Sequence, residues 1–197
     1  MLARIVIFEG PDGVGKTTLI KHIKEQYGKD AYYMHLRVHK DMKLWHTASA
    51  RLAISKKQDG KLVLLDRHWP SEQFYSHIYR EGPSYDPEEI YRRLKLEGAL
   101  YVWCLPSDIE QVKQNHRINR EKRKEAYYDI DKVIQMYNDY WNYPTSNLIN
   151  FHQNNLMDTL APLKKRPDFI RYDMFKEGHD LNAVTERIID KCFQMNL

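Results

Sequence analysis

The chain has 197 residues, of which 42% are hydrophobic and 29% charged, with a formal net charge of +4 and two cysteines. Such totals are typical of one globular domain that buries a core without disulfides or metals, and they argue against a disordered or disulfide-rich chain. No apolar run approaches the roughly 18 residues of a membrane span, and the N-terminus enters a strand rather than a signal peptide, so we expect a cytoplasmic protein without membrane contact.

Strand patterns and helix patterns alternate along the chain. Short apolar or β-branched runs predict five strands, at residues 3–10, 31–37, 61–66, 99–106 and 168–175. Amphipathic or capped segments predict helices at residues 16–28, 41–58, 71–82, 86–98, 107–124, 129–144 and 180–195. This alternation predicts an α/β fold in one domain over residues 1–197, with three layers: helices, a five-stranded parallel sheet, and helices.

The predicted helix boundaries depend on capping residues. The expected N-caps are Ser71, Asp86, Ser107 and Asp180, and the expected ends are Gly28 and Gly82. Residues 145–166 fit no clear element and are interpreted as an insertion. Ligands of such folds bind at the carboxyl ends of the strands. Gly10, Asp66 and Leu105 are all predicted to stand there.

One segment matches a phosphate-binding loop. Residues 10–17, Gly-Pro-Asp-Gly-Val-Gly-Lys-Thr, fit the pattern G-x-x-x-x-G-K-[ST] between a predicted strand and a predicted helix. Glycines let successive backbone N–H groups point at phosphate oxygens, and the helix N-terminus adds positive charge. Lys16 is expected between the β- and γ-phosphates of ATP. The expected ATP-binding residues are Gly10, Asp12, Gly13, Val14, Gly15, Lys16, Thr17 and Thr18.

A second motif supplies a carboxylate and a guanidinium. The apolar run at residues 62–66 ends in Asp66, and a buried strand that ends in an acid is a usual source of a metal carboxylate in such enzymes. Thr17 and Asp66 are therefore the predicted Mg²⁺ ligands, although a turn-capping role for Asp66 is the alternative. Arg67 follows, and its planar fork can bind two phosphate oxygens at once.

A basic run follows the fourth predicted strand. Residues 113–124 carry six Lys or Arg against one Glu, and Arg117, Arg120 and Arg123 recur every three residues. Arg117 and Arg120 would share roughly one helix face. They could close over the transferred phosphoryl group as a helical lid at about residues 114–128. A solvated basic face is the alternative.

Two motifs together resemble those of the thymidylate kinase and deoxynucleoside kinase group. "FEGPDGVGKTT" resembles the thymidylate kinase loop F-E-G-x-D-G-x-G-K-[ST]-T, and "DRHWPSEQFY" is similar to that family's D-R-Y-x-x-S-x-x-A-Y. The second motif matches at Asp66, Arg67, Ser71 and Tyr75. The order of predicted elements agrees over roughly residues 3–140.

The resemblance implies a P-loop kinase fold, ATP with Mg²⁺, and a nucleotide acceptor. It places Asp12 near the acceptor sugar or a catalytic arginine, Arg67 at the acceptor phosphate and Asp66 at the metal. It makes Arg117 and Arg120 lid or adenine-side arginines, and residues 176–184 the loop around the adenine. The expected catalytic residues are Asp12, Lys16, Asp66, Arg67, Arg117 and Arg120.

The chain departs from the family where the acceptor is read. His68 replaces a tyrosine, Phe74 replaces an alanine, and the R-E-P-G-G stretch is absent, which leaves Arg37 as the candidate there. Trp45, Trp69, Phe74 and Tyr75 could stack on a base or belong to the core. The expected substrate contacts are Arg37, Arg67, His68, Ser71, Phe74 and Tyr75.

Three functions stay open on these residues. The favoured one is an ATP-dependent deoxynucleoside monophosphate kinase. The second is a kinase that phosphorylates a hydroxymethylated pyrimidine, 5-hydroxymethyluracil, within DNA of the kind that DNA-modifying phages make, where a base would have to leave the duplex. The third is a P-loop nucleotide-binding protein that is not a kinase. The partners are a nucleotide or modified DNA, and a homodimer is an open alternative.

Overall fold

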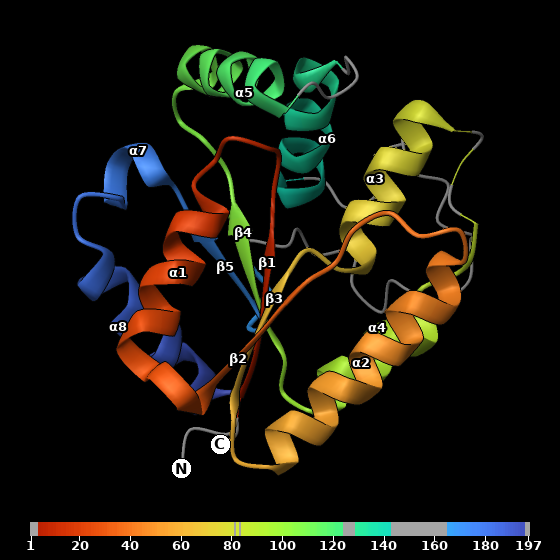
Figure 1. Ribbon diagram of the computed structural model, residues 1–197, viewed down its shortest axis with the longest axis vertical. Coiled ribbons are helices and arrows are strands. Elements are labelled where there is room, and N and C mark those ends of the chain that lie inside the picture. The colour runs from red at the N-terminus through yellow and green to blue at the C-terminus, as the bar shows by residue number, and fades with distance from the viewer. Residues whose placement is uncertain (1–3, 81, 83, 124–128, 143–164, 196–197) are drawn as a thin grey trace.

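Five parallel strands form one sheet in the order β2-β3-β1-β4-β5 (Figure 1). The computed structural model describes residues 4–80, 82, 84–123, 129–142 and 165–195. Its strands are β1 (Arg4–Glu9), β2 (Ala31–His35), β3 (Leu62–Asp66), β4 (Leu100–Cys104) and β5 (Phe169–Tyr172). The predicted five-stranded parallel sheet is therefore confirmed.

The central strands are buried on both faces, which explains their nearly continuous apolar runs. Every residue of β3 and β4 is buried, whereas the edge strand β2 is mostly half-buried. Phe8 pairs with Asp66, and Asp66 pairs with His35, so the next-to-last residue of β1 and the last residues of β3 and β2 lie side by side. This register brings the carboxyl ends of the strands to one edge, as predicted.

Helices cover both faces of the sheet. They are α1 (Lys16–Tyr27), α2 (Met42–Gln58), α3 (Trp69–Tyr79), α4 (Glu88–Leu96), α5 (Ile109–Arg123), α6 (Ile130–Asn142), α7 (Met174–Glu177) and α8 (Leu181–Gln194), with a 3-10 turn, η1 (Gly28–Asp30). In Figure 1, α1 and α8 lie on one side of the sheet and α2 and α4 on the other. The pair α5 and α6 stands beyond the carboxyl ends of the strands, and α6 packs against α3. The predicted three-layer α/β/α architecture is confirmed.

Some predicted helix boundaries are correct and others are wrong. Asp180 caps α8 by accepting from the backbone N–H of Ala183, and Gly28 ends α1, as expected. Three N-caps are corrected. Helix α3 begins at Trp69 with Pro70 in its first turn, so Ser71 is inside the helix. Helix α4 begins two residues after Asp86, although the Asp86 carboxylate still accepts from the N–H of Glu88. Asp108, not Ser107, accepts from the N–H of Gln111 at the start of α5.

The C-terminal end of α3 also differs from the prediction. The helix ends at Tyr79, and Arg80 rather than Gly82 is its C-cap. The predicted lid at residues 114–128 begins within the continuous helix α5 and ends outside the described residues. Most of the predicted insertion at residues 145–166 also lies outside them. Within the described part of the chain, none of the helices has both the length and the apolar character to cross a bilayer.

Candidate functional site

The loop between β1 and α1 curls around the amine of its own lysine. Gly10, Gly13 and Gly15 have φ angles of 148°, 83° and 81°, values that residues with a Cβ rarely adopt. Val14 is buried and anchors the loop in the core. The Lys16 Nζ donates to the carbonyl oxygen of Gly10 at 2.8 Å and to that of Pro11. This is the compact loop that the glycine pattern predicts.

The three glycines are also closely approached by other elements. A Cβ at Gly10 would stand 2.3 Å from the carbonyl oxygen of Cys104 on β4. A Cβ at Gly13 would lie 3.3 Å from the carbonyl oxygen of Val112 on α5, and one at Gly15 would lie 2.9 Å from the Met174 side chain on α7. The loop is therefore enclosed by β4, α5 and α7, and α5 lies directly against it.

Asp66 ends β3 beside the first turn of α1. Its Oδ2 lies 3.1 Å from His35 Nδ1, 3.3 Å from the Tyr33 hydroxyl and 3.5 Å from the Thr17 hydroxyl. Burial raises the pKa of the Asp66 carboxyl. The hydrogen bond from His35 and the positive charges of Lys16 and Arg67 lower this pKa by a larger amount, so the net shift is downward. Asp66 is therefore ionised at neutral pH.

The same carboxylate fits an Mg²⁺ site. Its Oδ1 is buried and has no hydrogen-bond partner among the described residues, and the exposed Thr17 hydroxyl lies beside Oδ2. In the described part of the chain no group of three or more His, Cys, Asp or Glu residues could hold a metal. One carboxylate and one hydroxyl suit Mg²⁺, which keeps most of its ligands as water and phosphate oxygens. Thr17 and Asp66 would therefore hold it.

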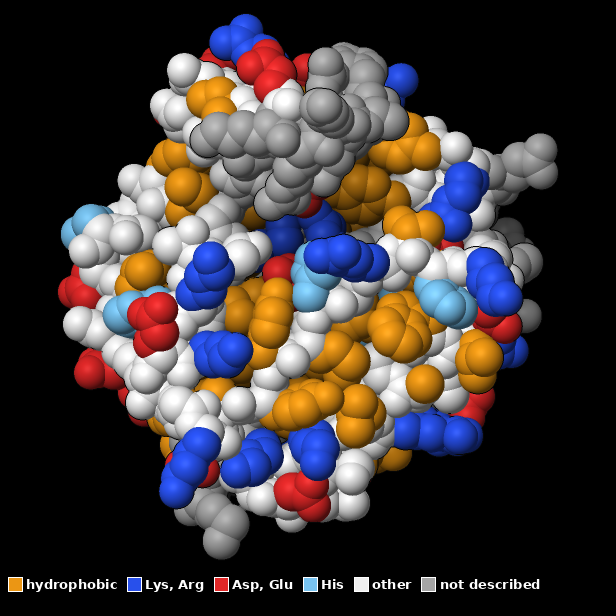
Figure 2. Space-filling model, in the orientation of Figure 1, with side chains coloured by type: hydrophobic (Ala, Val, Ile, Leu, Met, Phe, Trp, Pro, Cys, Tyr) orange, Lys and Arg blue, Asp and Glu red, His pale blue; other side chains and the backbone are white. Residues whose placement is uncertain are grey.

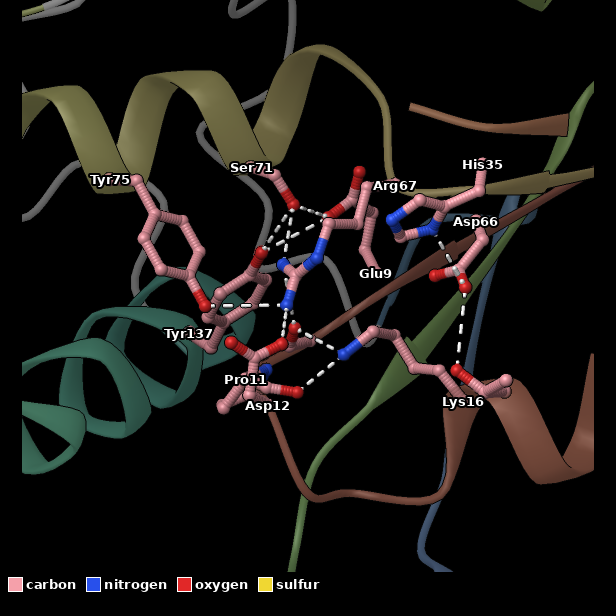
Figure 3. A network of polar contacts seen from close by, with 12 residues as sticks. Glu9, Pro11, Asp12, Lys16, His35, Asp66, Arg67, Ser71, Tyr75 and Tyr137 are labelled. Atoms are coloured by element: carbon pink, nitrogen blue, oxygen red, sulfur yellow. Dashed lines mark hydrogen bonds and ion pairs between the residues drawn. The ribbon is translucent and has the colours of Figure 1, made fainter. Parts of the chain in front are cut away.

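Arg67 lies at the turn from β3 to α3 and points toward the loop (Figure 3). Its Nη1 donates to the Gly10 carbonyl oxygen at 3.2 Å and to the Ser71 hydroxyl at 3.0 Å, and its Nη2 donates to the Asp12 carboxylate. The guanidinium also lies 5.1 Å from the centre of the Tyr75 ring. The structure thus brings together Asp12, Arg67, Ser71 and Tyr75, which the sequence placed in two separate motifs.

Glu9 is a site residue that the sequence analysis missed. It ends β1 with no exposed surface, and burial raises the pKa of its carboxyl, while the Ser71 hydrogen bond and the Arg67 charge oppose that rise. Its Oε1 accepts from the backbone N–H of His68 at 2.6 Å. Its Oε2 accepts from the hydroxyls of Ser71 at 2.6 Å and Tyr137 at 3.0 Å. An acid that ends a buried strand next to the loop was the available signal.

Lys16 and Arg67 bring two cations together at the base of the site, where both donate to the Gly10 carbonyl oxygen. Lys16 is 6% exposed, and burial, with repulsion from Arg67, lowers the pKa of its amine. Asp12 and Asp66 oppose that shift. The face of the molecule in Figure 2 is hollowed near its centre, where basic, acidic and histidine side chains lie next to one another. A polyphosphate is the kind of ligand that two adjacent, partly desolvated cations favour.

Two predicted substrate contacts lie in the core instead. His68 is 0% exposed, because it lies against α2, with Nε2 3.0 Å from the Ser49 hydroxyl and its ring centre 4.9 Å from that of His46. Phe74 is 1% exposed, with its ring centre 4.5 Å from that of Tyr137 and 5.9 Å from that of Trp103. Both side chains are therefore buried, and the expectation that His68 and Phe74 contact a substrate stays a prediction. Trp69 is buried as well, whereas Tyr75 is half-buried.

The remaining predicted residues lie at the rim. Arg37 is exposed after β2, and Thr18 is exposed on α1. Arg117 is exposed on α5, the helix that packs against Gly13. Arg120 belongs to the same helix, and its side chain lies outside the described part of the structure.

Comparisons with known proteins give a limited result. No model of a protein family matches the chain, and no curated protein matches it. Among solved structures, a gluconokinase from Sinorhizobium meliloti 1021 is similar, with 9% sequence identity and a TM-score of 0.49. The likeness covers 98% of this chain and 94% of that one. A likeness at this level says nothing about the substrate of this chain, so the function is argued from its own residues.

Proposed function

We propose that the chain is a P-loop kinase that transfers the γ-phosphoryl group of ATP to a deoxynucleoside monophosphate, in the manner of thymidylate kinase. One observation carries this proposal. The Arg67 guanidinium, held by Asp12, lies against the glycine loop that contains Lys16, and this supports a second phosphate site beside the first. A protein that only bound or hydrolysed ATP would not need that second site.

Each residue has a role in the proposed transfer. Lys16 binds the β- and γ-phosphates together with the backbone N–H groups of the loop. Arg67 binds the acceptor phosphate and aligns its oxygen for attack on the γ-phosphorus, while the bond to the β–γ bridging oxygen breaks. Thr17 and Asp66 would hold Mg²⁺, which when bound would neutralise phosphate charge. Arg117 and Arg120 on α5 would add charge from the lid side, and residues 176–184 would contact the adenine.

The acceptor needs little activation in this reaction. A nucleoside monophosphate already carries an anionic oxygen, so positioning and charge neutralisation are sufficient. Asp12 accordingly serves as the partner that orients Arg67, rather than as a general base. The pairing is charge-assisted and fixes the plane of the guanidinium.

A DNA acceptor is the second candidate, favoured by the segment between β2 and α2. Arg37, His39 and Lys40 are exposed there, and Val38 is 82% exposed, where the resembled family has its acceptor motif. An exposed basic and apolar segment suits a nucleic-acid strand. The acceptor would then be a hydroxymethylated pyrimidine within DNA.

The experiment offers γ-labelled ATP and Mg²⁺ with each deoxynucleoside monophosphate, or with DNA containing ordinary or hydroxymethylated pyrimidines. Label in a free diphosphate supports the proposal, label in DNA supports the second candidate, and release of phosphate alone contradicts both. Lys16→Ala should abolish transfer in either case. Arg67→Ala should raise the KM for the acceptor, whereas Arg93→Ala, which removes an exposed arginine paired with Glu89 on α4, should not.

A further inference from the structure

A continuous chain of hydrogen bonds connects α6 to the turn that carries Arg67. The Tyr137 hydroxyl on α6 donates to Glu9 Oε2 at 3.0 Å and lies 3.0 Å from the Ser71 hydroxyl. The Ser71 hydroxyl donates to the same Glu9 oxygen at 2.6 Å and accepts from Arg67 Nη1 at 3.0 Å. Figure 3 shows these groups converging on one side of the guanidinium, opposite Asp12.

The same chain also fixes the backbone at Arg67. The φ of Arg67 is 70°, a conformation that is costly for a residue with a Cβ and persists only where the surroundings enforce it. Its N–H donates to the Phe8 carbonyl oxygen at 3.0 Å, and the next N–H, that of His68, donates to Glu9 Oε1 at 2.6 Å. Both ends of the Glu9 carboxylate therefore hold the turn, one through the backbone and one through Ser71.

Tyr137 is rigidly placed for this contact. It has no exposed surface, and its ring packs against Phe74 and Trp103 at centroid distances of 4.5 Å and 5.2 Å. The Trp103 indole N–H donates to the Tyr137 carbonyl oxygen at 3.2 Å. Because the ring cannot move without disturbing the aromatic core, its hydroxyl is a fixed donor for Glu9.

We propose that Tyr137 is a positioning residue for Arg67: through Ser71 and Glu9 it holds the β3–α3 turn in the left-handed conformation that aims the guanidinium at the phosphate loop. The inference deepens the proposed function, on which its kinetic consequence depends, but its structural claim does not need that function. It makes the placement of α6 a condition for acceptor binding.

The test compares two variants, each of which lacks one buried tyrosine hydroxyl that donates a hydrogen bond to a carboxylate. Tyr137→Phe keeps the ring and removes the donor to Glu9. Tyr91→Phe removes a hydrogen bond of 3.2 Å from the Tyr91 hydroxyl to the Asp168 carboxylate. Tyr91 is on α4, away from the loop. Ser71→Ala breaks the same chain at its next link and serves if Tyr137→Phe folds poorly.

The first measurement is the side-chain N–H signal of Arg67 in ¹⁵N-labelled full-length protein, assigned by its loss in Arg67→Lys. Tyr137→Phe and Ser71→Ala should shift this signal and speed its exchange with water, and Tyr91→Phe should leave it unchanged. An Arg67 signal that is the same in Tyr137→Phe and Ser71→Ala as in the wild type overturns the inference, whatever the activity.

The second measurement separates this inference from the proposed function. Tyr137→Phe should raise the acceptor KM by about tenfold, the factor for a weakened hydrogen bond to a charged group, with the KM for ATP unchanged. The acid limb of the kcat/KM profile should move to higher pH, because Glu9 loses a donor that favours its ionised form. If the wild type transfers no phosphoryl group but the Arg67 signal shifts as described, the proposed function fails and the positioning role stands.

Discussion

Arg67 combines a strained backbone with a role that glycine could not fill. Among the described residues it is the one non-glycine position with a positive φ. That conformation costs on the order of 1 kcal/mol for a residue with a side chain. A glycine would remove the cost but also the guanidinium that contacts Gly10, Ser71 and Asp12. Strain of this kind at a proposed phosphate site is consistent with selection for function over stability.

Gly10 is the loop position where a side chain is least tolerable. Gly10→Ala would place its Cβ 2.3 Å from the Cys104 carbonyl oxygen at a φ of 148°. Because the obstacle is the backbone of the neighbouring strand, we expect a loss of about 3 kcal/mol in the free energy of unfolding. Denaturant titration checks this.

Gly15→Ala is the matched control for that titration. Its φ of 81° is also positive, but its nearest neighbours, the Cβ and Sδ atoms of Met174 at 2.9 Å, lie farther away than the strand backbone does at Gly10. We expect a smaller loss for Gly15→Ala. Equal losses for the two variants would mean that backbone strain, not the contact with β4, determines the cost at Gly10.

At the level of elements, α3 shows what the sequence reveals and what it conceals. The existence of this helix is predictable from the sequence. The sequence also predicts Ser71 as its N-cap, because serine is common at that position. In the structure Ser71 lies in the helix, where its hydroxyl bonds Glu9, 62 residues earlier, and lies beside Tyr137, 66 residues later. Local spacing carries no information about partners so distant. The earlier start of the helix also places Phe74 in the core, which local pattern alone could not decide.

A pair of buried histidines between α2 and the residue before α3 should make stability depend on pH. His46 on α2 and His68 before α3 are buried with ring centres 4.9 Å apart. Burial lowers the pKa of His46 to about 4, and burial together with His46 lowers the pKa of His68. The unfolded chain therefore binds more protons than the native state between about pH 4 and the unperturbed value of 6.5. Stability is complete above pH 6.5 and falls as the pH drops through that window.

His46→Gln tests this dependence. Glutamine keeps a polar group near the Tyr85 hydroxyl, the partner of His46 Nδ1, but does not titrate. The wild type should lose about 3 kcal/mol from His46 between pH 6.5 and 4, a loss that the variant should lack. The measurement is the free energy of unfolding of the wild type and of His46→Gln at several pH values. Because other groups such as Glu9 titrate in both proteins, their contributions cancel in the difference between the two. His39→Gln, at an exposed histidine, should keep the wild-type dependence, and an identical slope in His46→Gln would contradict the assignment.

At the level of the whole molecule, the sheet explains why the fold was predictable when the acceptor was not. Apolar runs and the glycine loop are local signals, and they predict the strands of the parallel sheet. The proposed acceptor side is different, because it would be assembled from α2, α3, α6 and the turn at Arg67. Its composition depends on which aromatic rings face inward, as Phe74 and Trp69 do. That choice is made by packing between distant segments.

Binding of ATP at the glycine loop between β1 and α1 should stabilise the whole domain. ATP with Mg²⁺ at about 100 times its Kd adds roughly 2.7 kcal/mol, since it binds the folded state alone. For a chain of this size each kcal/mol raises Tm by about 2–4 °C, so a shift of about 5–10 °C is expected in a thermal melt. Lys16→Ala should remove most of the shift, because Lys16 is the buried cation at the loop. Arg93→Ala should keep it, since Arg93 pairs with Glu89 on the surface of α4. A shift of the same size in Lys16→Ala would place the nucleotide elsewhere and contradict the site.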